Sequence, residues 1–255
     1  MPRLRRLLRS ALVTLIGLLL SLLLVSGLQV LAARVIDPPL TLTMLEASWD
    51  YSRARGELLL WEREWKDLDE LGTRVPRAVV SSEDARFWLH HGFDWQGICS
   101  AVEQNRERAA SGDTRRVGGS TISQQVARNV FLWQGQSYLR KGLETLYTLW
   151  MELLLPKERI LELYLNVAET GVLTFGVEAG AQRYFQRSAA QLSQEEAGRL
   201  AAVLPSPRRW GVQGKRASAR TVWIENNLAP WPGKPGFDEA LARHRERAPG
   251  PLDCW

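Results

Sequence analysis

The order of apolar and polar residues divides the chain into one uninterrupted apolar segment and a body of amphipathic helices. Residues 10–33 form a stretch of 24 residues without a charge. Over residues 138–155, leucines recur every three or four positions, which is the spacing of one helix face. The same analysis predicts helices over 76–90, 97–110, 157–166, 176–185, 193–204 and 221–228. Because no alternating strand runs of note occur, we expect a mainly α body.

Three stretches lack this periodicity. Residues 42–71 are charged and rich in Trp, and the part around 61–65 predicts a strand or a linker. Residues 106–116 combine four Arg with Ser, Gly and Asp, which predicts a mobile loop. The C-terminal residues, 231–255, are rich in Pro, Gly and Arg, which predicts a loosely ordered tail.

The apolar segment predicts a membrane anchor. As a helix, 24 residues span about 36 Å, enough for a hydrocarbon core of about 30 Å. Arg3, Arg5, Arg6 and Arg9 precede the segment and Arg34 alone follows it, which favours a cytoplasmic N-terminus. A cleaved signal peptide is the alternative, but its apolar region is normally shorter. The expected division is a cytoplasmic tail (1–9), a transmembrane anchor (10–33), one exported domain (34–228) and a C-terminal tail (229–255).

Charge and cysteine content exclude some classes of protein. The net charge is +5, but four of the 33 basic residues precede the anchor, which leaves 29 against 28 acidic residues. Because the net charge of the body is only +1, we expect no nucleic-acid binding. The only cysteines are Cys99 and Cys254, and the three His lack the spacing of metal ligands on one helix face. The eleven Trp suit stacking on sugars or membrane interfaces, although scattered Trp is more often core.

The segment 81–94 contains the first candidate for chemistry. Ser81 and Asp84 have the spacing of a capping box that begins a helix, and Gly92 has the position of its end. Glu83 would then lie in the first turn, where the helix dipole favours a carboxylate, while Phe87 and Trp88 favour its protonated form. A carboxylate under these opposing influences is a candidate general base. The alternative is an ordinary helix cap.

Two further strings carry polar groups with a plausible binding role. Gly118-Gly119 followed by Ser120 and Thr121 predicts a helix start with backbone N–H groups available to an anion or a sugar hydroxyl. Gln124 and Gln125 could bind a sugar, or the string could be a capped polar helix. Glu144 follows Arg140 by one helical turn, which by itself predicts a surface ion pair worth under about 1 kcal/mol.

Together these strings resemble the peptidoglycan glycosyltransferases of family 51, over about residues 40–228. The resemblance rests on five ordered motifs: Glu83-Asp84-x-x-Phe87-x-x-His90-x-Gly92, Gly118-Gly119-Ser120-Thr121-Ile122-Ser123-Gln124-Gln125, Arg140-Lys141-x-x-Glu144, Lys157-x-x-Ile160-Leu161-Glu162-x-Tyr164-Leu165-Asn166, and residues 176–185 with the following Leu204-Pro205-Ser206-Pro207. Too few residues follow 228 for a penicillin-binding transpeptidase domain, so the resemblance is to the members with one activity. Arg128 stands where many members have Lys, which keeps the charge.

The resemblance implies a fold and a reaction. The fold is mainly α, with a lysozyme-like lobe, a smaller membrane-associated lobe around the second motif, and one N-terminal transmembrane helix. The apolar residues 130–133 suit the membrane lobe, although a buried turn would look the same. The reaction transfers the growing glycan from undecaprenyl diphosphate to a sugar hydroxyl of lipid II, with inversion at the reacting carbon.

The resemblance also implies roles for residues. Glu83 is the general base and Glu144 is the second catalytic carboxylate, on the side of the leaving group. Substrate-binding residues are Ser120, Thr121, Gln124, Gln125, Arg128, Arg140 and Lys141, the last three on diphosphate. Supporting residues are Asp84, His90, Lys157 and Glu162, of which Lys157 and Glu162 are explained as well by a purely structural role.

No cofactor is required by the sequence, and a divalent cation (Mg or Mn) would bind through the substrate diphosphate. The expected partners are lipid II, the lipid-linked glycan and the membrane, with other cell-wall synthesis or division proteins as an open question. The expected location is the bacterial inner membrane, with the catalytic domain in the periplasm. Two other functions stay open: a membrane-anchored scaffold with little activity, and a lytic transglycosylase.

Overall fold

The computed structural model describes residues 2–114 and 116–247 of the chain. The remaining residues, with Cys254 and the end of the expected C-terminal tail, lie outside this description. The helices are α1 (Pro2–Ala33), α2 (Leu42–Arg55), α3 (Arg74–Glu83), α4 (Trp95–Ala110), α5 (Ile122–Val126), the π-helix η1 (Ala127–Phe131), α6 (Tyr138–Leu154), α7 (Lys157–Val167), α8 (Val177–Phe185), the 3-10 helix η2 (Ala189–Gln191), α9 (Gln194–Val203), α10 (Lys215–Asn226) and α11 (Phe237–Arg247).

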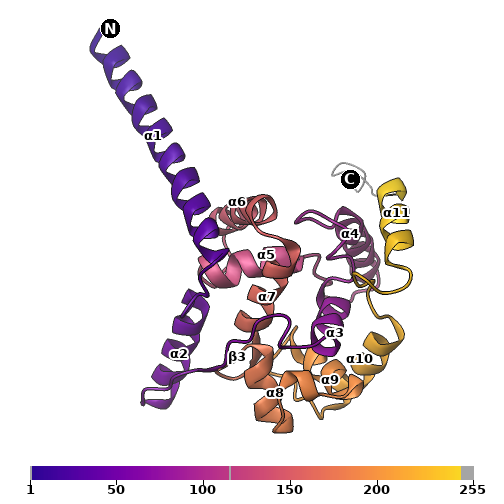
Figure 1. Cartoon of the computed structure of the whole chain (residues 1–255). Coiled ribbons are helices and arrows are strands. Elements are labelled where there is room, and N and C mark those ends of the chain that lie inside the picture. Colours follow the sequence, from indigo (N-terminus) through magenta and orange to yellow (C-terminus); the bar gives the residue numbers. More distant parts are fainter. Residues whose placement is uncertain (1, 115, 248–255) are drawn as a thin grey trace.

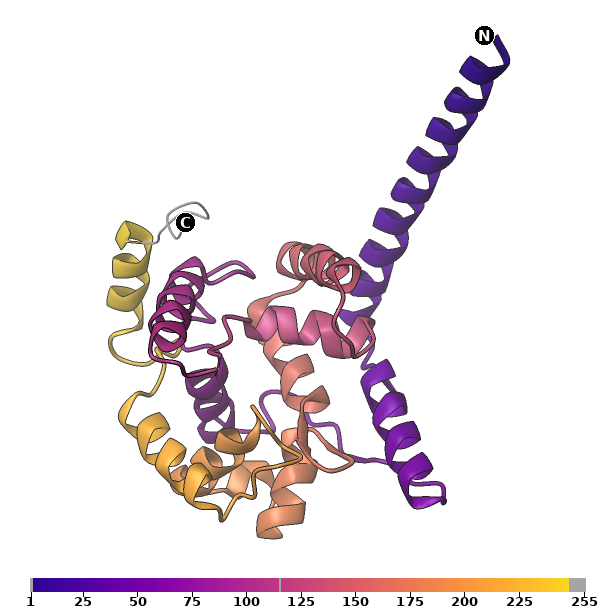
Figure 2. The same ribbon diagram turned by 180° about the vertical axis from the view of Figure 1, so that it is seen from behind.

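Helix α1 projects from a helical body, and Figure 1 shows its N-terminal part free of any neighbour. Helices α2, α5 and α6 surround the base of α1, whereas α3, α8, α9 and α10 form the far end of the body (Figures 1 and 2). Helix α7 runs between these two groups and contributes fully buried side chains, among them Ile160, Leu161 and Leu163. The mainly helical fold with one N-terminal apolar helix is therefore confirmed.

Helix α9 lies at the centre of the far end because its inward face is made of small residues. Ala197, Ala201 and Ala202 are fully buried, so neighbouring helices can approach its backbone closely. A Cβ atom on Gly198 would lie 2.8 Å from Thr221 Cγ2, which shows how closely α10 crosses α9. Helices α3 and α10 both pack on this short helix, and this packing brings the end of α3 next to α10.

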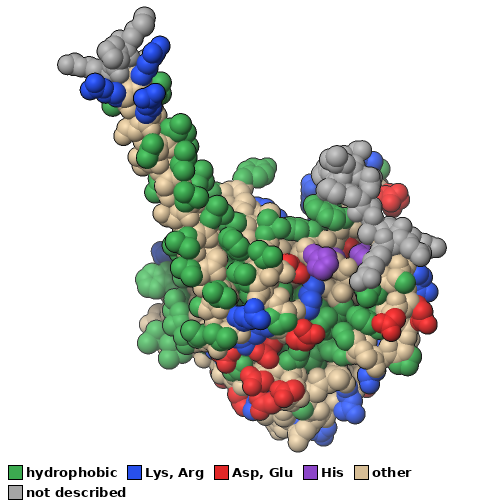
Figure 3. Space-filling view, turned by 45° about the horizontal axis from the view of Figure 1, so that its top comes forward, with side chains coloured by type: hydrophobic (Ala, Val, Ile, Leu, Met, Phe, Trp, Pro, Cys, Tyr) green, Lys and Arg blue, Asp and Glu red, His purple; other side chains and the backbone are tan. Residues whose placement is uncertain are grey.

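Helix α1 has the length and composition of a membrane span. An 18-residue window within Arg5–Ala33 has a mean hydropathy of 2.5. Apolar side chains cover the helix, and basic side chains gather near its tip (Figure 3). Its last two turns dock on the body. Trp150 Nε1 donates a hydrogen bond of 3.1 Å to Ser26 Oγ, and Arg159 Nε donates to Ala33 O at 2.9 Å. The expected apolar anchor is therefore a helix fixed to the body at its base.

The only strands among the described residues are short. The sheet has the order β1-β3-β2, with β1 (Glu62–Arg63) parallel to β3 (Thr174–Phe175) and β2 (Glu169–Gly171) antiparallel to it. Glu62 pairs with Thr174 and Arg63 with Phe175. Within the stretch 61–65, expected to be a strand or a linker, only Glu62 and Arg63 form a strand. This sheet holds the chain after α2 against the segment between α7 and α8.

Several predicted elements have other limits in the structure. The charged, Trp-rich stretch 42–71, for which no helix was expected, begins with helix α2, and Thr41 caps the N-terminus of that helix. Helix α4 includes residues 106–110 of the predicted loop, and α10 begins at Lys215 rather than at 221. The predicted loose tail contains α11, which the sequence pattern did not indicate because α11 has few apolar residues.

Residues 130–132 pack against the core, with Phe131 stacked on Tyr147. Of the apolar residues 130–133, these three therefore form the buried turn that was the alternative to a membrane contact, and only Trp133 is exposed.

Glycines with positive φ give the first testable prediction. Gly92 has φ +84°, and a Cβ there would lie 2.8 Å from Thr148 Cγ2; Gly56 has φ +74° with open space around it. We expect Gly56→Ala to cost about 1–2 kcal/mol of unfolding free energy, from backbone strain alone. Gly92→Ala should cost about 1–3 kcal/mol more, because α6 must also move. Denaturant unfolding of the full chain in detergent measures both, and equal losses would contradict this account.

Candidate active site

Glu83 is the last residue of α3, not a residue of a first turn. The capping-box prediction is therefore wrong: Ser81 lies inside the helix, where its Oγ donates to Arg77 O at 2.7 Å. The helix of 76–90 expected from the sequence ends seven residues early, and Gly92 ends the following turns. The dipole at this end of the helix disfavours a carboxylate, which is the reverse of the predicted effect.

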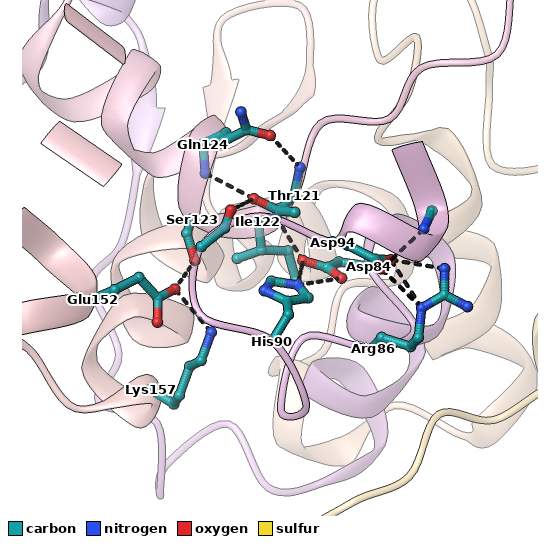
Figure 4. A network of polar contacts seen from close by, with 12 residues as sticks. Asp84, Arg86, His90, Asp94, Thr121, Ile122, Ser123, Gln124, Glu152 and Lys157 are labelled. Atoms are coloured by element: carbon teal, nitrogen blue, oxygen red, sulfur yellow. Dashed lines mark hydrogen bonds and ion pairs between the residues drawn. The ribbon is translucent and has the colours of Figure 1, made fainter. Parts of the chain in front are cut away.

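Asp84 explains why the helix ends there. Its carboxylate is buried, accepts the backbone N–H of Ile122 at 2.9 Å, and lies 2.9 Å from His90 Nε2 (Figure 4). A helical Asp84 could not reach these partners, and its φ of −160° takes the backbone out of the helix. The predicted support by Asp84 and His90 is thus a hydrogen-bonded link between the first and second motifs. The link also occupies the N-terminus of α5, so that helix start is not free to bind an anion.

Two predicted binding residues, Thr121 and Gln124, have structural partners instead. They form the capping box of α5, in which Thr121 Oγ1 accepts from the Gln124 backbone N–H and Gln124 Oε1 accepts from the Thr121 backbone N–H. Thr121 Oγ1 also donates to Gly92 O at 2.6 Å. Both side chains are buried, whereas Ser120 is exposed. Thr121 and Gln124 therefore cap α5, as the alternative of a capped polar helix expects, and both residues also line the cavities described below.

Gln125 joins Glu83 to the core. Its Nε2 donates to Glu83 Oε2 at 3.1 Å, while its Oε1 accepts from the Tyr164 hydroxyl at 3.3 Å. Burial, with the negative charge of Glu83, raises the pKa of Tyr164 well above its usual value, so the phenol keeps its proton and donates it. The amide must then direct its N–H groups to Glu83. Gln125 thereby favours the ionised form of that carboxylate.

Burial is the main influence on the pKa of Glu83, whose side chain is 9% exposed. It raises the pKa of Glu83 above its usual value, against the opposing effects of the Gln125 hydrogen bond, the Arg220 charge and the Ser82 hydroxyl. The raised pKa agrees in direction with the apolar wall expected from the sequence. A buried carboxylate with a few fixed donors is a suitable proton acceptor.

Arg220 is a site residue that the sequence did not indicate. Its Nη2 donates to Ser82 O at 2.8 Å and lies 3.9 Å from Glu83 Oε1. It comes from α10, and its position follows from the packing of α10 and α3 on α9. No spacing within the sequence relates residues 82 and 220. Only the tertiary structure could reveal this neighbour.

Cavities lie on both sides of the Glu83–Gln125 pair. A cavity of about 190 Å³ is lined by Glu83, Ser120 and Trp223, and it shares Gly119 and Ser120 with a second one, of about 290 Å³, that reaches Lys141. A third, of about 320 Å³, is lined by Gln125, Arg128 and residues of α2 and of the segment after α9. Cationic side chains therefore line two cavities near the pair: Lys141 lines the second cavity and Arg128 lines the third.

Glu144 is buried rather than exposed, so its pairing with Arg140 is not the surface ion pair that helical spacing alone suggests. Its Oε2 lies 2.7 Å from Arg140 Nη1, and its Oε1 pairs with Lys141 Nζ. Arg140 is buried too, whereas the Lys141 side chain is 48% exposed. Glu144 thus lies behind the cavity wall and fixes two cations, of which Lys141 reaches the cavity.

The remaining supporting residues hold elements together. Lys157 pairs with Glu152 at 2.8 Å and lies 4.4 Å from the centre of the Phe87 ring, and Glu152 in turn accepts from Ser123 (Figure 4). Burial lowers the pKa of Lys157, against the opposing charge of Glu152. Glu162 accepts the backbone N–H of Leu68 at 2.8 Å. These contacts agree with the purely structural role that was the alternative for Lys157 and Glu162.

Comparison with known proteins supplies the family context. Residues 57–229 match the family described as Transglycosylase. A protein of Xanthomonas campestris pv. campestris (strain B100), called biosynthetic peptidoglycan transglycosylase, is 48% identical over 221 residues, covering 84% of this chain and 86% of that protein. A protein of the same name from Xylella fastidiosa (strain 9a5c) is 45% identical over 222 residues, covering 86% and 89%.

The raised pKa of Glu83 predicts a cost in stability. The folded state holds the Glu83 proton more tightly than the unfolded chain, so stability falls as the pH rises from about 4.3, the unfolded value, through the folded pKa. We expect Glu83→Gln to raise the midpoint of thermal unfolding at pH 7.5, and the gain should shrink toward pH 4.5. Asp84→Asn is the control and should lower it, because Asp84 accepts two hydrogen bonds in the core. A gain from Glu83→Gln that grows at low pH would contradict this account.

Proposed function

The chain belongs to the transglycosylase family, and from that premise we propose that it polymerises the glycan of peptidoglycan with Glu83 as general base. The observation that carries the proposal is the position of Glu83: its carboxylate is buried, held by Gln125 and Arg220, and lines a cavity. The raised pKa increases its basicity, while both neighbours favour the ionised form that a base must have.

In the proposed step, a hydroxyl of the acceptor sugar of lipid II loses its proton to Glu83. Its oxygen forms the new bond to the anomeric carbon of the lipid-linked glycan. The bond from that carbon to undecaprenyl diphosphate breaks on the opposite face, the diphosphate keeps the electron pair, and the carbon inverts. Such an in-line displacement needs a base on one side and cations on the other.

The cations suit two diphosphates. We assign the leaving diphosphate to the cavity that Lys141 lines. The buried Glu144 pairs with Lys141 there, and the exposed Ser120 lines the same cavity. The diphosphate of the acceptor suits the other side, where Arg128 lines the larger cavity with Gln125. Arg140 would act through Glu144 and not directly on the substrate, because both side chains are buried against each other.

A divalent cation would enter with the diphosphate of the substrate. Among the residues that the structure describes, no group of three or more His, Cys, Asp or Glu is placed to hold a metal ion. A cation on the diphosphate would neutralise charge on the leaving group. Carboxylates near the third cavity, such as Glu46 and Glu169, line it without forming such a group.

The anchor sets the location in this proposal. With the Arg-rich end of α1 in the cytoplasm, the body lies at the outer face of the inner membrane. The base of α1 docks beside α6, so the Lys141 side of the site lies on the membrane half of the body (Figure 1). A lipid-linked diphosphate could reach that side without leaving the bilayer.

Polymerisation of labelled lipid II by the full chain in detergent tests the reaction and the base. We expect linear glycan from the wild type, and a rate lower by a factor of about 10² to 10⁴ for Glu83→Gln, the usual contribution of a general base. Glu103→Gln, an exposed carboxylate on α4, is the matched control and should keep wild-type activity. Equal rates for Glu83→Gln and the wild type would exclude Glu83 as the base. Shortened glycan strands would favour a lytic enzyme, and no change in lipid or glycan would favour a scaffold.

The hydrogen bond from Gln125 predicts a change in pH dependence. Gln125→Met removes the N–H donor that lowers the pKa of Glu83 and leaves a side chain of similar size. The pKa of Glu83 should rise further, so the acid limb of the rate–pH profile should move to higher pH. Rates measured from pH 5 to 9 give the comparison. A profile that keeps its acid limb and falls equally at every pH would show that Gln125 acts only in binding.

A further inference from the structure

Helix α10 brings a second side chain to the cavity beside Glu83. Arg220 and Trp223 are three residues apart and therefore share a face of α10. Arg220 lies 3.9 Å from Glu83, and Trp223 lines the same cavity of about 190 Å³ as Glu83 and Ser120. We propose that the indole of Trp223 is the stacking platform for a sugar of the growing glycan strand, next to the reacting carbon. This inference rests on the proposed function.

Core packing does not explain the position of Trp223. Its side chain is 50% exposed, while Ala217, Thr221 and Ile224 are the buried residues of α10. Five other tryptophans pack against the core: Trp65, Trp88, Trp150, Trp210 and Trp231. Trp49 is 68% exposed, but only Trp223 among the described tryptophans lines the cavity beside Glu83. A large apolar side chain left open to solvent in a cavity beside a buried carboxylate is a feature of ligand sites.

Gly118, Gly119 and Ser120, which line the same cavity as Trp223, offer hydrogen-bond donors and space. Gly118 and Gly119 carry no side chain, and a Cβ on Gly118 would meet nothing within 4 Å. The backbone N–H groups of Gly118, Gly119 and Ser120 donate to no acceptor among the described residues. A sugar in this cavity could place the C–H groups of its ring on the indole and its hydroxyl or acetamido oxygens on these N–H groups.

The place of α10 favours a sugar over a lipid as the occupant. Figures 1 and 2 show α10 at the end of the body away from α1, so Trp223 does not lie at the expected membrane surface. Gly119 and Ser120 also line the second cavity, which reaches Lys141, the side that we assign to the leaving diphosphate. The sugar bonded to that diphosphate belongs to the growing strand. Stacking depends little on orientation, which suits a strand that must shift after each addition.

The test separates the glycan donor from the lipid II acceptor. Full-length Trp223→Ala, Trp223→Phe and Val222→Ala are compared in detergent, with Val222 as control because it is 57% exposed but does not line the cavity. For Trp223→Ala we expect the KM for a preformed lipid-linked glycan to rise about tenfold and the product strands to shorten. The KM for lipid II should change less than twofold. Trp223→Phe should restore most of the loss, and Val222→Ala should match the wild type.

A binding experiment keeps this test separate from that of the reaction. Soluble uncrosslinked strands of alternating N-acetylglucosamine and N-acetylmuramic acid are titrated into the Glu83→Gln protein with and without Trp223→Ala. About tenfold weaker binding by the double variant supports the platform even if the wild type polymerises nothing, in which case the proposed function alone fails. Equal binding by both proteins would overturn the proposal that Trp223 is the stacking platform. So would a Trp223→Ala variant that loses only its affinity for lipid vesicles, since this outcome would assign Trp223 to the membrane.

Discussion

The arrangement of the site depends on the buried carboxylate of Asp84. By accepting the backbone N–H of Ile122 and pairing with His90, it ends α3 at Glu83 and fixes the start of α5 beside that end. Gln125 lies one turn into α5 and consequently reaches Glu83. A buried carboxylate without these partners would cost several kcal/mol, so the turn after α3, the start of α5 and the hydrogen bond to His90 depend on one another.

Stability and function oppose each other at Glu83. Its carboxylate lies at the negative end of a helix and is removed from water, and both conditions favour the protonated form. Gln125 and Arg220 offset part of that cost without removing it. The Tyr164 hydroxyl supports this balance from the core, because it fixes the orientation of the Gln125 amide. Glu144 is buried as well, and its pairing with Arg140 and Lys141 holds Lys141 in place at the cavity.

The anchor is part of the same structure and not a free tether. Trp150 and Arg159 hydrogen-bond to the last turns of α1, and Trp150 packs on Gly27, where a Cβ would lie 3.4 Å from the indole. The position of the body relative to α1 is therefore set by side-chain contacts. Helix α6, which begins with the segment that carries Lys141, lies beside the base of α1, whereas α10 lies at the far end of the body (Figure 1).

The sequence by itself determined the apolar anchor, most of the helices and the family, because each depends on spacing along the chain. It gave the wrong end for α3 and a free helix start at Thr121, since local capping patterns cannot show that Asp84 bonds to Ile122. It also could not place Arg220 or Trp223 beside Glu83, or show that Glu144 is buried. Those neighbours lie on different helices, and only the packing of α3 and α10 on α9, and of α5 on α7, decides their distances.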